Sequence, residues 1–275
     1  MKSVSGEWMR VLVALALVGL VSGCATPPAA RSGIAGGDGP RRVLVVVAHP
    51  DDENMAGPFL AKLARQGHDV RLVIATDGKY GTRATDLPPD ELGPLRRRES
   101  ECAALALGIP PPIFLAIDRL DTKNGVRAYL DGRRQLLTAL GEQLDAFAPD
   151  ALFTFGPDGE YGHPEHIVVG AALTEVLLRD GLVEKYPLYY LAWAKEQVAD
   201  DDELSYVDAR YLSVKATHTD ADERKSFEAA RCYASQTKAE EIEALVRDVS
   251  ADRTSTYFFR RFAAPAGAPV PGFLE

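Results

Sequence analysis

Two short polar clusters in this chain have the residue types and the spacing of a catalytic metal site. The first, HPDDE, begins at His49, and the second, HPEH, begins at His163. Each places two potential ligands three positions apart, because Asp52 follows His49 and His166 follows His163. On a helical turn this spacing puts both side chains on one face. Imidazole and carboxylate ligands without a thiolate favour zinc or another borderline divalent ion.

Each cluster taken alone would more often be a capped turn after a strand. Three of the five histidines, however, fall in these two short segments, whereas His68 and His218 are interpreted as ordinary turn and loop residues. A site built from His49, Asp52 and one histidine of the second cluster would keep a fourth position open for water, which is typical of catalytic zinc. The sequence therefore predicts one catalytic divalent ion.

The elements that must position these clusters alternate between apolar runs of strand length and amphipathic stretches of helix length. Strands are expected at 43–48, 70–76, 112–117, 151–155 and 188–193, and helices at 56–66, 92–107, 132–147 and 164–179. This order predicts an α/β fold, Rossmann-like, with a mostly parallel sheet and helices on both faces. Ligands of such sheets bind beyond the carboxyl ends of the strands, where both clusters lie.

The pattern is less regular after residue 193. A further strand is expected within 206–214, and one long helix or two within 220–246. The folded domain is expected to cover 42–262. Residues 263–275 are rich in Pro and Gly and are expected to form a tail.

The first 23 residues have the pattern of a lipoprotein signal peptide. A basic start precedes an apolar run that is too short to span a membrane, and the run ends in Val-Ser-Gly-Cys, which resembles a lipobox. Cys24 is therefore the expected lipidation site, with a plain secretory signal as the alternative. Residues 24–41 are expected to be a flexible tether. The sequence predicts a lipid-anchored protein of the cell envelope, and Ala25 favours the outer membrane.

Charge and loop composition argue against nucleic acid and nucleotides as ligands. The formal net charge is −9 and no long run of Lys or Arg occurs, so nucleic acid is not an expected partner. A nucleotide-binding protein is also disfavoured, because the first turn reads AHPDDEN where a Gly-rich phosphate loop is needed. A lipoprotein that binds glycan or envelope components without catalysis stays open as an alternative.

Two cysteines remain after Cys24. Cys102 and Cys232 both lie in helical patterns. We expect two reduced core thiols rather than a disulfide, although an exported protein could form one.

The two clusters together resemble the signature of a known enzyme family. AHPDDE at 48–53 and YGHPEH at 161–166 are similar to the paired motifs of the LmbE-like, or PIG-L, de-N-acetylases. These are zinc hydrolases that remove acetyl groups from N-acetylglucosamine-type substrates. The weaker matches are TDGKYG at 76–81, RRRESECAALALG at 96–108, FLAID at 114–118 and YASQ at 233–236. The resemblance implies an LmbE-like fold, hydrolysis of an amide bond, and a small-molecule or glycan substrate.

The resemblance also implies a role for each residue of the paired motifs. His49, Asp52 and His166 would be the zinc ligands. Asp51 would be the general base that takes a proton from the water activated by the metal. His163 would support the tetrahedral oxyanion or protonate the leaving amine. Such a division is chemically sensible, because zinc lowers the pKa of a water to roughly 7 while a nearby carboxylate moves the proton.

Further residues match the family pattern around this centre. Tyr161 would help to polarise the carbonyl, and Glu53 would orient a ligand. Arg96 and Glu99 match a substrate-side pair, and Asp118 matches the acid after the third strand. The polar segments 86–94 and 118–132 are expected to rim the pocket and set substrate choice. The C-terminal segment lacks the acidic residue expected before its last aromatic pair, so its contribution to the site stays open.

Overall fold

The computed structural model describes residues 39–198, 204–251 and 256–264 of the chain. The predicted signal peptide with Cys24, most of the tether and most of the tail lie outside the described residues. Among the helices of the described ranges, none is both long and apolar enough to cross a membrane.

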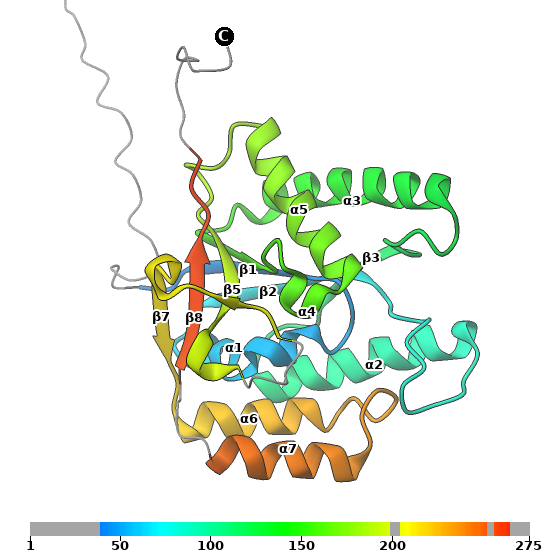
Figure 1. Ribbon diagram of the computed structural model, residues 1–275, viewed down its shortest axis with the longest axis vertical. Helices are drawn as coiled ribbons and strands as arrows, with labels where there is room; N and C mark the ends of the chain where they lie inside the picture. Colours follow the sequence, from blue (N-terminus) through cyan, green and yellow to red (C-terminus); the bar gives the residue numbers. More distant parts are fainter. Residues whose placement is uncertain (1–38, 199–203, 252–255, 265–275) are drawn as a thin grey trace, which may run out of the picture. The chain divides into compact units, whose positions relative to one another are not determined.

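One mixed sheet forms the centre of the domain (Figure 1). Its strands run in the order β3-β2-β1-β4-β5-β8-β7, and the short β6 pairs with β5. The strands are β1 (Arg42–Val47), β2 (Asp69–Thr76), β3 (Ile113–Ile117), β4 (Ala151–Thr154), β5 (Leu188–Ala194), β6 (Tyr206–Val207), β7 (Val214–Thr217) and β8 (Thr256–Arg261). The first five strands are parallel, and β8 is antiparallel to both β5 and β7. The predicted mostly parallel sheet is confirmed.

Helices cover both faces of this sheet, as predicted. In Figure 1, α3 and α5 lie on one side, and α1, α2 and α6 lie on the other, with α7 outside α6. The helices are α1 (Gly57–Arg65), α2 (Pro89–Leu107), α3 (Val126–Phe147), α4 (Gly159–Gly162), α5 (Pro164–Arg179), α6 (Asp220–Ala230) and α7 (Ala239–Ala251). Three short 3-10 helices complete the described elements: η2 (Asp52–Ala56), η3 (Lys195–Gln197) and η4 (Ala209–Tyr211).

The position of β1 explains its composition. It pairs with β2 on one side and β4 on the other, so Val43 lies between Val70 and Ala151. All residues of β1 after Arg42 are buried, because helices cover both of its faces. A parallel strand in this position needs apolar side chains in both directions. The run VLVVV is therefore the rigid support behind the first polar cluster.

Local signals set the ends of the helices near the site. Pro164 occupies the first position of α5, where its fixed φ suits a helix and its missing N–H costs nothing. Gly108 ends α2 in the left-handed conformation, with φ of 81°. Thr219 caps α6 and forms a capping box with Asp222. α5 thus begins directly at the second polar cluster.

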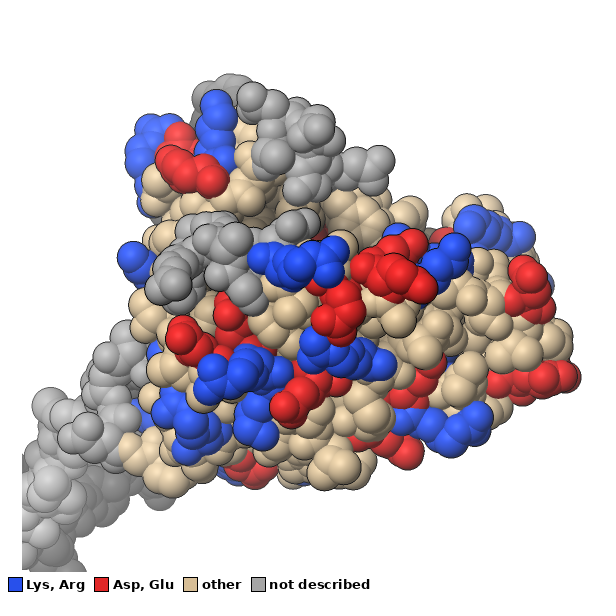
Figure 2. Space-filling model, turned by 90° about the horizontal axis from the view of Figure 1, so that it is seen from below, with Lys and Arg blue, Asp and Glu red and all other residues tan. Residues whose placement is uncertain are grey.

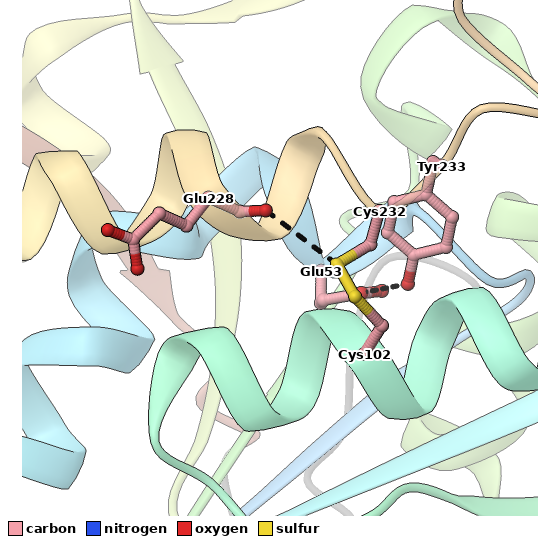
Figure 3. Close-up of a disulfide and its surroundings, with 5 residues drawn as sticks. All are labelled: Glu53, Cys102, Glu228, Cys232 and Tyr233. Carbon is pink, nitrogen blue, oxygen red and sulfur yellow. Dashed lines mark hydrogen bonds between the residues drawn. A yellow bond between two sulfur atoms is a disulfide. The ribbon is translucent and has the colours of Figure 1, made fainter.

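The expectation of two reduced thiols is wrong. Cys102 and Cys232 form a disulfide with Cα atoms 5.9 Å apart, which links α2 to the residue after the C-cap of α6 (Figure 3). Both cysteines do lie in or beside helices, as the pattern indicated. The pattern could not show that α6 packs against α2, because the two cysteines are 130 positions apart in the sequence.

The strand prediction at 206–214 is also wrong in its extent. This segment contains the two-residue strand β6 and the 3-10 helix η4, and β7 starts only at Val214. Residues 220–246 contain α6 and the first part of α7, so two helices form, which was one of the two expected arrangements. Strand β8 was not predicted.

Charged side chains of both signs cover the face shown in Figure 2. Lys and Arg are interspersed there with Asp and Glu. This distribution gives a phosphate backbone no uniform basic surface on that face.

Candidate active site

The two polar clusters lie side by side because β1 and β4 are neighbouring parallel strands. His49 follows the carboxyl end of β1 after a single residue. His163 is the N-cap of α5, and His166 lies in its first turn. The ring centroids of His163 and His166 are 4.5 Å apart, and those of His49 and His163 are 4.9 Å apart. Segments more than a hundred residues apart in the sequence therefore meet at one edge of the sheet.

A tight turn after β1 separates the two neighbouring aspartates. Asp51 has a φ of 92°, a left-handed conformation that costs a non-glycine residue on the order of 1–3 kcal/mol. Asp52 then starts η2, and its Oδ2 accepts hydrogen bonds from the backbone N–H groups of Ala48 at 2.9 Å and His49 at 2.7 Å. The turn fixes Asp52 against the end of the strand and leaves Asp51 partly exposed at the pocket.

The side chains of the two clusters can hold a metal ion. One ring nitrogen each of His49, His163 and His166 lies within 4.8 Å of the others. Asp52 lies close to two of these histidines, with Oδ1 at 3.2 Å from Nε2 of His166 and Oδ2 at 3.5 Å from Nδ1 of His49. Nε2 of His166 is buried and has no hydrogen-bond partner among the described residues, although Oδ1 of Asp52 is near. A cation bound between Nε2 of His166 and Oδ1 of Asp52 would fit this arrangement, because both atoms can donate an electron pair to it.

The three histidines and Asp52 are therefore the candidate ligands, and three of these four residues form the predicted set. This set is His49, Asp52 and His166, and both of its histidines lie within 3.5 Å of the Asp52 carboxylate. His163 belongs to the same cluster of nitrogens, so it could ligate as well as act in catalysis. Which three bind stays a prediction. Two imidazoles and one carboxylate with an open position fit a catalytic zinc.

The charges of this cluster act strongly on one another. Burial lowers the pKa of His49, but the carboxylates of Asp52 and Glu165 outweigh it and raise this pKa to about 10. Burial would raise the pKa of Asp52, but His49 and His166 hold it well below its ordinary value. Burial and the two neighbouring histidines lower the pKa of His163 to about 4. The ring of His163 is therefore neutral at pH 7.

Asp51 faces a different partner from Asp52. Its Oδ1 lies 3.0 Å from Nη2 of Arg96, whose side chain is buried and also donates a hydrogen bond to the carbonyl of Gly78 at 2.8 Å. Partial burial raises the pKa of Asp51 to about 6, against the opposing effect of Arg96. A carboxylate with a pKa near neutrality is suited to accepting a proton. Arg96 thus contacts the predicted base directly.

Glu165 is a site residue that the sequence reasoning missed. Its Oε2 lies 2.6 Å from Nε2 of His49, and its Oε1 accepts a hydrogen bond from the backbone N–H of Leu120 at 2.5 Å. This contact fixes the orientation of the His49 ring, as carboxylates commonly do for histidines that bind metals. The signal was present, because Glu165 is the acidic residue within HPEH, but the sequence did not show which way it points.

Glu53 and Glu99 are buried outside the pocket. Glu53 accepts a hydrogen bond from the hydroxyl of Tyr233, and burial raises its pKa to about 8. Glu99 accepts hydrogen bonds from the backbone N–H of Ser235 at 2.8 Å and from its hydroxyl at 2.6 Å. The structure therefore separates Glu99 from Arg96, its predicted partner at the substrate. Both glutamates face the segment after α6 rather than a ligand or a substrate.

A polar pocket of about 210 Å³ opens above the cluster. Asp118 lies at its rim, where its carboxylate contacts Nζ of Lys79 at 2.5 Å and accepts a hydrogen bond from the hydroxyl of Tyr80 at 3.2 Å. Tyr161 is 44% exposed at the mouth, and burial of its hydroxyl is the main cause that raises its pKa to about 12. The segment 118–123 lines the pocket in part, as predicted, whereas most of 86–94 forms the start of α2.

A larger open groove lies elsewhere on the domain. It has a volume of about 900 Å³ and runs along α5 between Leu178, Tyr190 and Phe262. None of the residues predicted for the site lines it. The convergence of ionisable groups, and not the size of the cavity, therefore identifies the candidate active site.

Comparison with known proteins agrees with this geometry. Residues 44–177 match the family model described as PIG-L, GlcNAc-PI de-N-acetylase. The 1D-myo-inositol 2-acetamido-2-deoxy-alpha-D-glucopyranoside deacetylase of Corynebacterium kroppenstedtii is 35% identical over 158 residues, which cover 48% of this chain and 41% of the relative. The chain spans about half the length of the curated relatives it matches.

Solved structures share the fold at low sequence identity. The N,N'-diacetylchitobiose deacetylase of Pyrococcus horikoshii has a TM-score of 0.59 and 22% identity, over 81% of this chain and 84% of its own. The 4-carboxy-2-hydroxymuconate hydratase of Pseudomonas putida has a TM-score of 0.57 and 17% identity, over 84% and 100%. The second of these proteins is named for a different reaction, so the fold alone does not assign an activity.

The match to the family model covers both polar clusters and the strands that carry them. Residues 44–177, which carry both polar clusters, therefore resemble the PIG-L family of de-N-acetylases.

Proposed function

We propose that this protein is a zinc-dependent hydrolase that removes the N-acetyl group from an N-acetylglucosamine-type sugar or its conjugate. The observation that carries the proposal is the convergence of His49, Asp52 and His166 beside an aspartate, Asp51, that is not needed to hold the ion. A protein that only binds glycans has no use for a proton acceptor at this position. The family and its relatives support the choice of an acetamido group as the substrate.

The chain's own residues can carry out each proton movement of amide hydrolysis. A divalent ion at this site would lower the pKa of a water and stabilise negative charge on the carbonyl oxygen. Asp51 takes a proton from the attacking water as the new C–O bond forms. It returns this proton to the leaving nitrogen as the C–N bond breaks, which yields acetic acid and the amine; at neutral pH the acid then loses its proton and the amine gains one. The pKa of Asp51, near 6, suits both directions of transfer.

Two side chains at the mouth can act on the carbonyl oxygen. Because the pKa of His163 lies near 4, its neutral ring can donate one N–H to the developing oxyanion. Because the pKa of Tyr161 lies near 12, its hydroxyl keeps its proton at neutral pH and can donate to the same oxygen. Such donors commonly contribute 10²–10³-fold to rate, on the order of 3–4 kcal/mol each.

The pocket walls fit a sugar rather than an apolar acyl compound. Asp118, Arg119, Lys123 and Gln236 line the opening and offer donors and acceptors for hydroxyl groups. The pocket, of about 210 Å³, is small, so we expect it to hold the acetamido-bearing sugar while the rest of a conjugate remains outside.

The experiment that tests the activity is release of free amine by the purified protein with Cys24→Ser. N-acetylglucosamine conjugates, chitooligosaccharides and peptidoglycan fragments form the panel, each with and without a chelator. We expect amine release that the chelator abolishes and Zn²⁺ restores. Activity that survives complete removal of metal would overturn the mechanism. Saturable glycan binding with no release on any substrate would favour the non-catalytic binding protein.

We also propose that the protein is a lipid-anchored lipoprotein of the cell envelope, with the outer membrane favoured in a Gram-negative cell. The support is the lipobox-like sequence that ends at Cys24. Fractionation of cells expressing the intact chain is expected to place it with membranes. Cys24→Ser is expected to release it to the soluble fraction or to stop its processing. Equal membrane association of both proteins would contradict lipidation at Cys24.

A further inference from the structure

The segment Cys232–Gln236, here called the 232–236 turn, contacts three parts of the domain that carry the active site. It follows α6, and it lies among α2, η2 and the loop after β2. Its residues Tyr233, Ser235 and Gln236 are all buried. Gln236 also lines the pocket, and each of these three side chains makes a polar contact with an element that carries the site.

The turn contacts η2 at Glu53, the residue after the predicted metal ligand Asp52. The Tyr233 hydroxyl donates a hydrogen bond to Oε1 of Glu53, and both side chains are 1% exposed. Figure 3 shows the tyrosine ring directed at this carboxylate from the end of α6. Glu53 is adjacent to Asp52 in η2, so a shift of Glu53 must move the backbone that presents Asp52.

The other contacts of the turn fix α2 and the pocket wall. Ser235 holds Glu99 through its N–H and its hydroxyl, and Glu99 lies one helical turn from Arg96, the partner of Asp51. Gln236 donates a hydrogen bond to the carbonyl of Gly81 at 2.8 Å and itself lines the pocket. The turn therefore connects the ligand-bearing η2, the base-contacting helix and the pocket loop.

The disulfide attaches this turn covalently to α2. Cys232 begins the turn, and Cys102 lies on α2 three residues after Glu99. The Cys102 residue is exposed, which makes the bond accessible to a dithiol in solution. Figure 3 draws this disulfide together with the contact between Tyr233 and Glu53; Cys232 directly precedes Tyr233 in the chain.

We propose that the Cys102–Cys232 disulfide and Tyr233 are positioning elements of the active site, and that reduction of the disulfide lowers zinc affinity and turnover. The inference rests on the proposed de-N-acetylase function. In the reduction, a dithiol gives two electrons and two protons to the disulfide, becomes a cyclic disulfide, and leaves two protein thiols. The freed turn then holds Glu53 and the pocket loop at Gly81 less firmly, so Asp52 and the pocket wall lose their fixed geometry.

The test uses the full-length chain with Cys24→Ser, so that Cys102 and Cys232 are the remaining cysteines. Zn²⁺ affinity is measured by competition with a chromogenic chelator, before and after treatment with dithiothreitol. We expect about tenfold weaker zinc binding and about tenfold lower kcat after reduction, by analogy with the loss of outer-shell partners in other metal sites. Amide hydrogen exchange should quicken in residues 50–56 while the sheet stays protected.

Three variants separate positioning from general stability. Cys102→Ser/Cys232→Ser should behave like the reduced protein and show no response to dithiothreitol. Tyr233→Phe keeps the ring and the disulfide but removes the hydroxyl, and it should weaken zinc binding on its own. Tyr211→Phe, which alters an exposed tyrosine of η4, is the matched control and should change nothing.

Each outcome decides the proposal. Reduced and oxidised proteins with equal zinc affinity and equal exchange in 50–56 would overturn it, even if the reduced protein melts at a lower temperature. An oxidised protein that releases no amine from any substrate would instead count against the proposed function. The zinc and exchange measurements still test the positioning role in that case, because neither needs turnover.

Discussion

Asp51 and Asp52 are neighbours in the chain, yet the left-handed backbone at Asp51 directs their carboxylates to different partners. Asp52 is held by the N–H groups at the end of β1 and lies near two histidines. Asp51 lies beside the Arg96 guanidinium and borders the pocket. Two adjacent residues of one type can therefore perform different tasks, because their surroundings shift the pKa of one up and that of the other down.

This division predicts unequal effects of mutation. Asp51→Asn should keep its zinc and lose about 10²–10⁴-fold in kcat, since only the proton acceptor is removed. Asp52→Ala should lose most of its zinc and, with it, its activity. Metal content by inductively coupled plasma spectrometry and kcat by amine release provide the measurements. Full activity in Asp51→Asn at normal zinc content would contradict the assignment.

Glu165 is not a predicted ligand, but mutation of Glu165 should affect metal binding through its contact with His49. Its carboxylate orients His49 from the far side of the ring. Glu165→Ala should weaken zinc affinity by about 10–100-fold, and Glu165→Gln should recover part of the loss, since an amide oxygen can still accept from the ring. Glu175→Gln, on the same helix but paired with Arg133, is the control. Chelator competition that finds Glu165→Ala unchanged would exclude this orienting role.

The sequence could identify the site residues that follow a strand or begin a helix, because ligands bind at these ends of a parallel sheet. His49 and His166 lie where a parallel sheet opens, so pattern and family resemblance both locate them. Glu165 and Glu99 could not be separated this way. Each is an acidic residue in a helix close to the clusters, and only the packing shows that one points to His49 and the other to Ser235.

Helix α6 is attached to α1 by an ion pair between the half-exposed Arg65 and the buried Asp222. Arg65 donates two hydrogen bonds to Asp222, at 2.8 and 2.9 Å, and Asp222 also accepts one from the backbone N–H of Thr219. The bonds from Arg65 lower the pKa of Asp222 from 3.8 to about 2, although burial opposes them. Because α6 leads into the 232–236 turn, this pair also determines where that turn begins.

The lowered pKa predicts how stability depends on pH. The folded pKa of Asp222 lies below its unfolded value, so its contribution is complete above about pH 4 and is lost as pH falls through about 2. Asp222→Asn should lower the free energy of unfolding by on the order of 1 kcal/mol at pH 7, because solvent screens the half-exposed Arg65, and by less at pH 3. Urea unfolding at both pH values measures this. Asp220→Asn, exposed in the same helical turn, should have little effect.

The sequence predicted the parallel half of the sheet better than the antiparallel half. Strands β1, β2 and β4 are covered on both faces, so they are nearly continuous apolar runs. This pattern is easy to recognise in the sequence, because a strand with one exposed face alternates apolar and polar residues. Strand β8, TYFFRR, has mostly half-buried residues and two arginines, and its partners β5 and β7 come from distant parts of the chain. Its pairing is a long-range property that no local pattern shows.

The disulfide between Cys102 and Cys232 closes a long covalent loop in the described part of the chain. It joins positions 130 residues apart and links the helix pair α6–α7 to the sheet domain through α2. Disulfides persist in oxidising compartments and are rare in the cytosol. The bond is therefore consistent with the proposed export of the protein, although the thiol prediction from sequence did not anticipate it.

A loop of this length predicts a large effect on stability. The chain-entropy model assigns about 4–5 kcal/mol to a closed loop of roughly a hundred residues, and measured values for native disulfides are about 2–5 kcal/mol. Against a Cys24→Ser parent, Cys102→Ser/Cys232→Ser should lower the free energy of unfolding by about 2–5 kcal/mol in guanidinium titrations. The parent treated with dithiothreitol should match the double variant, since both lack the same bond.

The two measurements together separate the bond from the side chains that form it. If only the double variant is destabilised, the serine hydroxyls and not the missing bond cause the loss, because the reduced parent keeps its thiols. If neither protein changes its midpoint, the bond does not form in solution. Agreement of the two would mean that the domain depends on an oxidising environment for much of its stability, which is what an exported protein of this fold would need.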